Sequence, residues 1–143
     1  MGVIVCATGN GVQSRSVQSA AVELARVEQK RLVFVHVVDL RQLGELEEAL
    51  RPAARAELAW LGEASLRLAR DRARRQGVAA ESVILHGDVC QALEGYLRDH
   101  PVDLVLLGAA SNDEITRCAR RMEQELGVAV QFVAAQGDGL DTN

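Results

Sequence analysis

Five short apolar segments, separated by helical patterns, constrain the fold of this chain more than any other feature. They are residues Val3–Ala7, Leu32–Val38, Val83–Leu85, Leu104–Leu107 and Val128–Val133. Most are near-continuous runs of Val, Ile and Leu, which is typical of strands buried on both faces of a parallel sheet. The aromatic content of 3% agrees with this, because the core must then be built from aliphatic side chains.

Four helical patterns lie between the apolar segments. Residues that would share one helix face recur every three to four positions, through Val17–Val27, Leu58–Arg72, Leu93–Leu97 and Ile115–Met122. Strands and helices therefore alternate, and consecutive parallel strands are joined by right-handed crossovers. The sequence predicts an α/β fold with a single doubly wound, five-stranded parallel sheet flanked by four helices.

Capping signals mark the ends of these helices. A short acceptor followed three residues later by Gln or Glu, the spacing of a capping box, occurs at Asn10, Asp88 and Ser111. Gly77 is expected to close the second helix as the residue after its C-cap. His100-Pro101 stops the third helix, because the residue before proline avoids the α region.

The second helix contains the only Trp of the chain. Its expected buried seam is Leu58, Leu61 and Leu68, at helical spacing. Trp60 lies one position off this seam, so it either edges the core or contacts a partner.

The length and composition fit one globular domain. The 143 residues are 48% hydrophobic and 25% charged, which is ordinary for a soluble protein. Residues 1–136 are expected to form the domain, with an irregular connection at 40–52 that includes a short helix at 45–50. Residues 137–143 are expected to form a disordered polar tail. No apolar run approaches the roughly 20 residues of a membrane span, and we find no secretory signal pattern at the N-terminus.

Charge and cysteine content limit the partners and the compartment. A net charge of -4 opposes a nucleic-acid binder, which needs a basic patch. The helix that carries the arginines within 67–75 also has Glu57, Glu63 and Asp71, and no aromatic residue lies nearby to stack on bases, so a solvated helix face explains the arginines better than nucleic-acid contact. Cys6, Cys90 and Cys118 are odd in number, far apart and in no CxxC pair, which favours reduced thiols. We expect a cytoplasmic protein with neither nucleic acid nor membrane as a partner.

A ligand site in such a fold lies at the carboxyl ends of the strands, where the strand order reverses. With the order 3-2-1-4-5, the reversal falls between the first and fourth strands, whose ends are the segments 7–11 and 108–112. Both segments contain glycine and open a helix, whose free N–H groups and dipole favour an anion. The turn Gly9-Asn10-Gly11 is either a phosphate cradle or a tight strand-to-helix turn, and the turn is favoured.

Side chains near this point also have two interpretations. Thr8 either binds ribose or phosphate or satisfies local backbone, and Asp39 either binds ribose hydroxyls or is a solvated strand-end residue. Asp88 is best explained as a helix cap and His36 as a packed core residue. Because no GxSxG elbow, P-loop or metal-ligand spacing occurs, we expect no catalytic residue and no metal.

Four stretches together resemble the universal stress protein family: "VIVCATGNGVQSRSVQSAAVELA", "RLVFVHVVDL", "VILHGDVCQAL" and "DHPVDLVLLGAAS". The similarity covers residues 2–135. It implies the strand order 3-2-1-4-5 and an adenine nucleotide alpha hydrolase-like fold. It also implies a homodimer through the fifth strand, which would cover an otherwise exposed apolar sheet edge. The expected interface residues are Val128, Val130, Phe132 and Val133.

The family divides into ATP-binding members and members that do not bind ATP. The binders carry G-x2-G-x9-G-[ST] after the fourth strand, and its backbone amides wrap the phosphates. Here Gly108 matches the first glycine, but Ser111 stands at the second and obstructs close backbone approach. The third glycine and its hydroxyl neighbour fall at Arg121-Met122, or at Ile115-Thr116 when the count runs back from the last strand.

The binders also usually carry an Asp at the end of the first strand, where this chain has Gly9 or Thr8. We therefore expect a regulatory stress-response protein that acts through dimerisation and contacts with an unknown protein, has a degenerate nucleotide pocket and needs no cofactor. The alternative is a sensor that binds ATP or AMP. Its candidate nucleotide-binding residues are Ala7, Thr8, Gly9, Val38, Asp39, Gly108, Ser111, Asn112 and Thr116.

Overall fold

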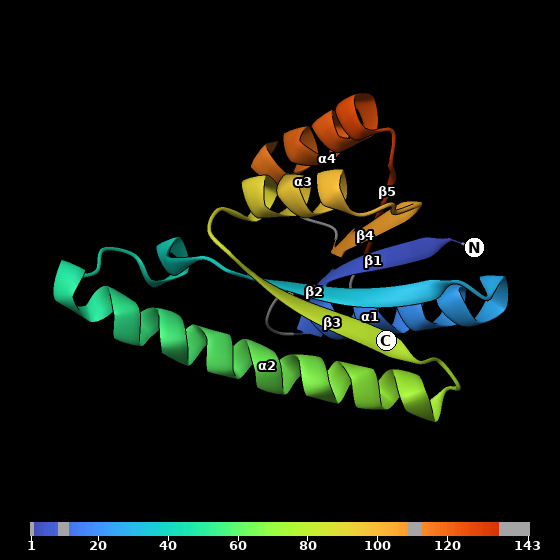
Figure 1. Ribbon diagram of the computed structural model, residues 1–143, viewed down its shortest axis with the longest axis horizontal. Coiled ribbons are helices and arrows are strands. Elements are labelled where there is room, and N and C mark those ends of the chain that lie inside the picture. Colours follow the sequence, from blue (N-terminus) through green and yellow to red (C-terminus); the bar gives the residue numbers. More distant parts are fainter. Residues whose placement is uncertain (1, 9–11, 109–112, 135–143) are drawn as a thin grey trace, which may run out of the picture.

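The computed structural model describes residues 2–8, 12–108 and 113–134 of the chain (Figure 1). Within these residues, a parallel sheet lies between two layers of helices. The turn Gly9-Asn10-Gly11 and the expected tail at 137–143 lie outside the described residues. The expected domain boundary at residue 136 lies outside them too and stays a prediction.

The predicted succession of strands and helices is confirmed. In chain order the elements are β1 (Val3–Thr8), α1 (Val12–Glu28), β2 (Arg31–Val38), the 3-10 helices η1 (Leu40–Leu43) and η2 (Glu48–Leu50), α2 (Arg51–Arg75), β3 (Ala80–His86), α3 (Val89–Asp99), β4 (Leu104–Gly108), α4 (Asp113–Leu126) and β5 (Ala129–Val133). Among the described residues, no helix is both long and apolar enough to cross a membrane.

The sheet order is β3-β2-β1-β4-β5 with all neighbours parallel, as predicted. β1 lies at the centre, where Ile4 pairs with Leu32 of β2 and with Leu104 of β4. Helices α1 and α2 cover one face of the sheet, and α3 and α4 cover the other (Figure 1).

The continuous apolar runs follow from this two-sided burial. Alternate residues of one strand enter different cores: Ile4 packs with α1 and α2, whereas Val5 packs with α3 and α4. Both side chains are fully buried. Each strand therefore needs apolar residues at consecutive positions.

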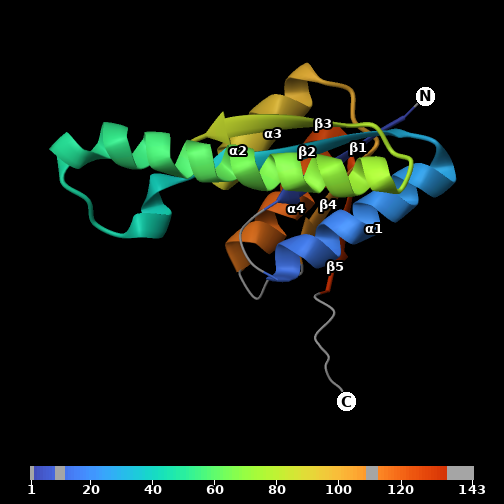
Figure 2. The ribbon, with the colours of Figure 1, turned by 90° about the horizontal axis from the view of Figure 1, so that it is seen from below.

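Helix α2 buries a different face from the one that the sequence predicted. Leu61 and Leu68 are exposed, and the residues that α2 buries are Gly62, Leu66, Ala69 and Ala73. Three of these four buried residues are small and allow the helix to lie close to the sheet, and Leu66 is the leucine that faces inward with them. Trp60 is 70% exposed, which excludes the core-edge interpretation. Figure 2 shows that the N-terminal part of α2 extends beyond the sheet.

The helix ends agree with the capping signals that the structure describes. Gly77 follows the C-cap of α2 with φ +84°, a conformation that favours glycine. The Asp88 carboxylate accepts a hydrogen bond from the Gln91 N–H at 3.1 Å and caps α3. α3 ends at Asp99, and His100 before the proline is extended. Asn10 and Ser111, the other two predicted caps, lie outside the described residues.

The connection between β2 and α2 contains two 3-10 helices instead of the single short helix expected at 45–50. Glu47 is extended, with ψ 142°, so a helix cannot run through it. Pro52 in the first turn of α2 is tolerated because the N–H that it lacks would have no helical partner there.

The expectation of three reduced thiols is wrong for two of them. Cys90 of α3 and Cys118 of α4 form a disulfide, with Cα atoms 5.9 Å apart. Their separation of 28 residues conceals that α3 and α4 lie side by side on one face of the sheet. Cys6 is a free, buried cysteine whose pKa is raised by burial.

Candidate functional site

The carboxyl ends of β1, β2 and β4 lie along one edge of the sheet, as parallel pairing requires. Thr8 ends β1 beside His36 of β2, Asp39 directly follows β2, and Gly108 ends β4. The reversal of strand order falls between β1 and β4, where a ligand site was predicted. The structure describes six predicted site residues, Ala7, Thr8, Val38, Asp39, Gly108 and Thr116, while Gly9, Ser111 and Asn112 lie outside the described residues.

Thr8 uses its hydroxyl within the protein. The Thr8 Oγ1–H donates to the Val35 carbonyl oxygen at 3.3 Å, and the residue is buried. The Thr8 carbonyl oxygen accepts from Nδ1 of His36, also at 3.3 Å. Burial lowers the pKa of His36, so the ring is a neutral core residue, as predicted. Across the described ranges, no three His, Cys, Asp or Glu side chains group so as to hold a metal ion.

Asp39 is engaged by Arg41, two residues further on. Its carboxylate accepts from the Arg41 backbone N–H at 3.0 Å and thereby caps η1. The Arg41 guanidinium donates to the same carboxylate at 2.8 Å and reaches Asp88 at 2.5 Å. Hydrogen bonds from Arg41 hold the pKa of Asp39 below its usual range. The carboxylate that was a candidate for ribose is therefore bound by a guanidinium of the chain itself.

A cavity of about 250 Å³ opens beside this ion pair, at the ends of β2 and β3. Arg51 and Arg55 of α2 line it together with Asp39 and Arg41. The sequence patterns did not indicate Arg41, Arg51 or Arg55 as site residues. The spacing of Arg51 and Arg55 places them one helical turn apart on one face, but only the path of residues 40–50 brings that face to the strand ends.

The segment after β4 has helix where the ATP-binding motif would continue. α4 begins at Asp113, so Thr116 lies in its first turn, where it is exposed. Arg121 and Met122, the positions counted for the third glycine and its hydroxyl neighbour, lie within α4. Met122 is buried in the core, and Arg121 donates to the Glu94 carboxylate of α3 at 2.9 Å. These two positions stabilise the packing of α3 against α4.

The predicted dimer edge contains residues of different exposure. β5 is an end strand of the sheet. Val128 precedes the strand and is 5% exposed in the core, and Val130 and Val133 are half-buried. Phe132 is 38% exposed, so it is the member of this set with most surface available to a partner. The interface itself stays a prediction.

Comparisons with known proteins agree with this architecture. The chain matches the model of the universal stress protein family over residues 1–122. No curated protein matches it. Its structure is similar to the universal stress protein UspA from Lactobacillus plantarum, with 20% identity, a TM-score of 0.74 and coverage of 92% of this chain and 97% of that one. A universal stress family protein from Burkholderia pseudomallei is 27% identical, with a TM-score of 0.68 and coverage of 92% and 95%.

Some similar structures hold nucleotides. A universal stress family protein from Arabidopsis thaliana, solved with AMP bound, is 14% identical, with a TM-score of 0.67 and coverage of 100% of this chain and 97% of that one. Two other universal stress proteins, the second from Archaeoglobus fulgidus, are complexes with cAMP and with dAMP. The family model covers most of the chain, and the sheet order is the one that the resemblance implied. The chain therefore belongs to the universal stress protein family.

Proposed function

We propose that this chain is a regulatory stress-response protein that acts through dimerisation and contacts with another protein. In this proposal the nucleotide pocket is degenerate and no cofactor is required. The protein has no catalytic residue and works in the cytoplasm.

The engagement of Asp39 carries the proposal. A ribose hydroxyl would have to displace Arg41 from this carboxylate, which receives guanidinium hydrogen bonds of 2.8 and 3.1 Å. Thr8 is also engaged, through its bond to the Val35 carbonyl. The positions counted for the third glycine of the ATP-binding motif and for its hydroxyl neighbour lie within α4. Each of these features opposes a nucleotide bound in the manner of the ATP-binding relatives.

An adenine-nucleotide sensor is the second candidate function. Arg51 and Arg55 line the cavity beside Asp39 and supply positive charge that suits phosphate. Similar structures that hold AMP, cAMP and dAMP support this candidate. A sensor would require the nucleotide to draw Arg41 away from Asp39.

Nucleotide extraction separates the two candidates. We expect acid-precipitated protein to release no stoichiometric AMP, and the melting temperature not to shift with millimolar AMP. Arg41→Ala frees the Asp39 carboxylate and should raise the affinity for AMP. Arg98→Ala, in the last turn of α3 and away from the cavity, is the matched control. Stoichiometric AMP in the wild-type extract, or stoichiometric ATP that Arg55→Gln loses, would overturn the degenerate pocket and favour the sensor.

Light scattering tests the dimer separately. We expect size-exclusion chromatography with light scattering to give twice the chain mass of 15.4 kDa at micromolar concentration. Phe132→Glu puts like charges at the paired edge and should shift the mass toward the monomer. Trp60→Glu changes an exposed residue of α2 and should leave the dimer intact. A wild-type mass near 15.4 kDa would exclude this part of the proposal.

A further inference from the structure

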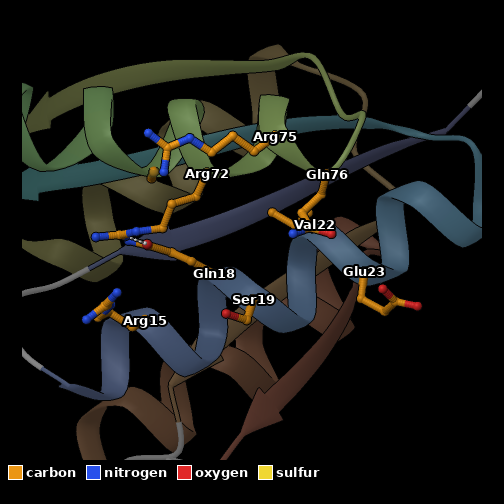
Figure 3. Close-up of a pocket in the computed structure, with 9 residues that line it drawn as sticks. Arg15, Gln18, Ser19, Val22, Glu23, Arg72, Arg75 and Gln76 are labelled. Carbon is orange, nitrogen blue, oxygen red and sulfur yellow. Dashed lines mark hydrogen bonds between the residues drawn. The ribbon is translucent and has the colours of Figure 1, made fainter.

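A groove runs between α1 and α2, on the face of the sheet opposite α3 and α4 (Figure 3). Its volume is about 420 Å³, compared with about 250 Å³ for the cavity beside Asp39, and the two share no lining residue. Beneath the groove, the core includes the small side chains Ala21 and Ala25 of α1 and Ala69 and Ala73 of α2. They fill little of the space between the helices. The volume lies in the range of small-molecule sites, roughly 300–1,000 Å³.

Three arginines give the groove a positive charge in a chain of net charge -4. Arg15 comes from the N-terminal part of α1, and Arg72 and Arg75 come from α2. Residues three apart in a helix project from the same side. Figure 3 shows the guanidinium groups of all three gathered toward one end of the groove, with Glu23 at the other. The charges are thus separated along its length.

Carboxylates of the chain leave part of this charge uncompensated. Glu23 pairs with Arg26 at 2.6 Å, and Arg75 pairs with Asp71 at 2.8 Å. Within the part of the chain that the structure describes, Arg15 and Arg72 have no ion pair. Like charges at one end of a groove repel each other, and an anion bound between them relieves that repulsion.

Gln18 positions one of these guanidinium groups. Its side chain rises from α1 into the groove, and the residue is only 5% exposed. The Gln18 Oε1 accepts from Arg72 Nη1 at 3.2 Å across the two helices. The bond uses one N–H of a group that has five. The others stay available to a ligand while Gln18 holds the guanidinium at the groove.

We propose that this groove binds a small molecule that carries a chain of two or more phosphate groups. A guanidinium binds phosphate through two parallel hydrogen bonds, and three guanidinium groups exceed what one phosphate requires. Val22 and Ala69 supply an apolar floor, as ligand sites usually have. The proposal does not depend on the proposed function, because Asp39 and the carboxyl ends of the strands take no part in the groove.

Calorimetric titration with inorganic tripolyphosphate, at constant physiological ionic strength, tests this proposal. We expect one site per chain and tighter binding than for orthophosphate or sulfate. Arg15→Gln and Arg72→Gln should each weaken binding by roughly tenfold or more, because each removes charge-assisted hydrogen bonds. Arg72→Lys keeps the charge but loses the planar guanidinium, so its affinity for tripolyphosphate should lie between those of the wild type and Arg72→Gln. Arg98→Gln removes the same charge from α3 and should change the affinity by less than about twofold.

The melting temperature of each variant verifies that it is folded. Equal affinity for sulfate and tripolyphosphate would overturn the proposal, as would equal losses in Arg98→Gln and Arg72→Gln, because the attraction would then be nonspecific. Loss of tripolyphosphate binding in Arg55→Gln would place the anion in the cavity beside Asp39 and overturn it too. Titration with ATP identifies the kind of ligand. If ATP and tripolyphosphate bind with equal affinity, the groove recognises the phosphate chain alone. Tighter binding that Arg72→Gln weakens indicates a nucleoside polyphosphate.

Discussion

The two helical layers cover equal cores but are held together differently. Among the described residues, each face of the sheet buries a cluster of thirteen. α3 and α4 are joined to each other by the Cys90–Cys118 disulfide and by the Glu94–Arg121 ion pair at 2.9 Å. α1 and α2 share the hydrogen bond between Gln18 and Arg72, beside an open groove. We call the α3–α4 layer the closed layer, because a disulfide and an ion pair link its two helices. The α1–α2 layer is the open layer, because a groove lies between its two helices.

The same contrast appears at the surface. Among the described residues of α1 and α2, the exposed large apolar side chains are Val27, Trp60, Leu61 and Leu68, and those described for α3 and α4 include none. The number of residues that a helical layer buries against the sheet therefore does not decide how many apolar side chains its outer side exposes.

Breaking the cross-link of the closed layer should have the largest effect. Cys90→Ala combined with Cys118→Ala is expected to lower the free energy of unfolding by about 3–4 kcal/mol, because the disulfide closes a loop of 28 residues. Urea denaturation without reductant measures the loss. Reductant should destabilise the wild type similarly and leave the double variant unchanged. Three free thiols in the denatured, unreduced wild type, instead of the single thiol of Cys6, would contradict the cross-link.

Replacing a glycine with alanine should change the free energy of unfolding in opposite directions in the two layers. A Cβ at Gly62 of α2 would lie 2.5 Å from Cδ2 of the buried His36, so the ring or the helix would have to shift. Gly62→Ala is expected to lower the free energy of unfolding by about 1–3 kcal/mol. At Gly95 of α3 a Cβ meets nothing within 4 Å, so Gly95→Ala should raise it by about 0.5–1 kcal/mol. Urea titrations that shift both variants in one direction would refute this difference.

The open layer should also be sensitive to pH through His36. Burial lowers the pKa of His36, so below about pH 6.5, the ordinary histidine value, the unfolded chain binds more protons than the native protein. The stability that the neutral ring provides is present above that pH and is lost as the pH falls toward the folded pKa. The contribution of His36 to the free energy of unfolding should change by less than about 1.4 kcal/mol per pH unit. In urea denaturation of His36→Gln, the free energy of unfolding should change less between pH 7 and pH 5.5 than it does in the wild type. An equal change in both proteins would exclude His36 as the source of the pH dependence.

Replacing the exposed Trp should have the smallest effect. Trp60→Ser is expected to change the free energy of unfolding by less than about 0.5 kcal/mol, because the side chain is 70% exposed. Leu66→Ala, on the buried side of the same helix, is the matched comparison and should cost about 2–5 kcal/mol. Fluorescence of the native wild type should show a solvent-exposed indole. A blue-shifted emission at low protein concentration would contradict the exposure.

Much of the fold could be predicted because buried strands and helix ends leave local signals. Ile4 and Val5 face different cores, so an uninterrupted apolar run was the correct sign of a central strand. Gly77 and Asp88 act at the helix termini where their chemistry indicates. The buried face of α2 was predicted wrongly, since hydrophobicity pointed to Leu61 and Leu68. Close approach to the sheet instead selected small residues, which a count of apolar positions does not distinguish.

The candidate sites were harder to predict, because their contacts join distant parts of the chain. Arg41 reaches Asp88 across 47 residues, and Gln18 meets Arg72 across 54. Nothing local to any of these residues indicates its partner. The partner depends on which helices and loops become neighbours and on how close they lie.

The order of strands and helices in this protein could be predicted from its residues alone, and the similarity to a family indicated how the strands pair. Local periodicity and capping suffice for the order, because each reflects burial or hydrogen bonding within a few residues. The packing of the helices and loops was needed to show that Arg41 binds Asp39, that Cys90 meets Cys118, and that three arginines line one groove. Charge pairing and cross-linking depend on distance in space, and that distance exists only once the helices pack on the sheet.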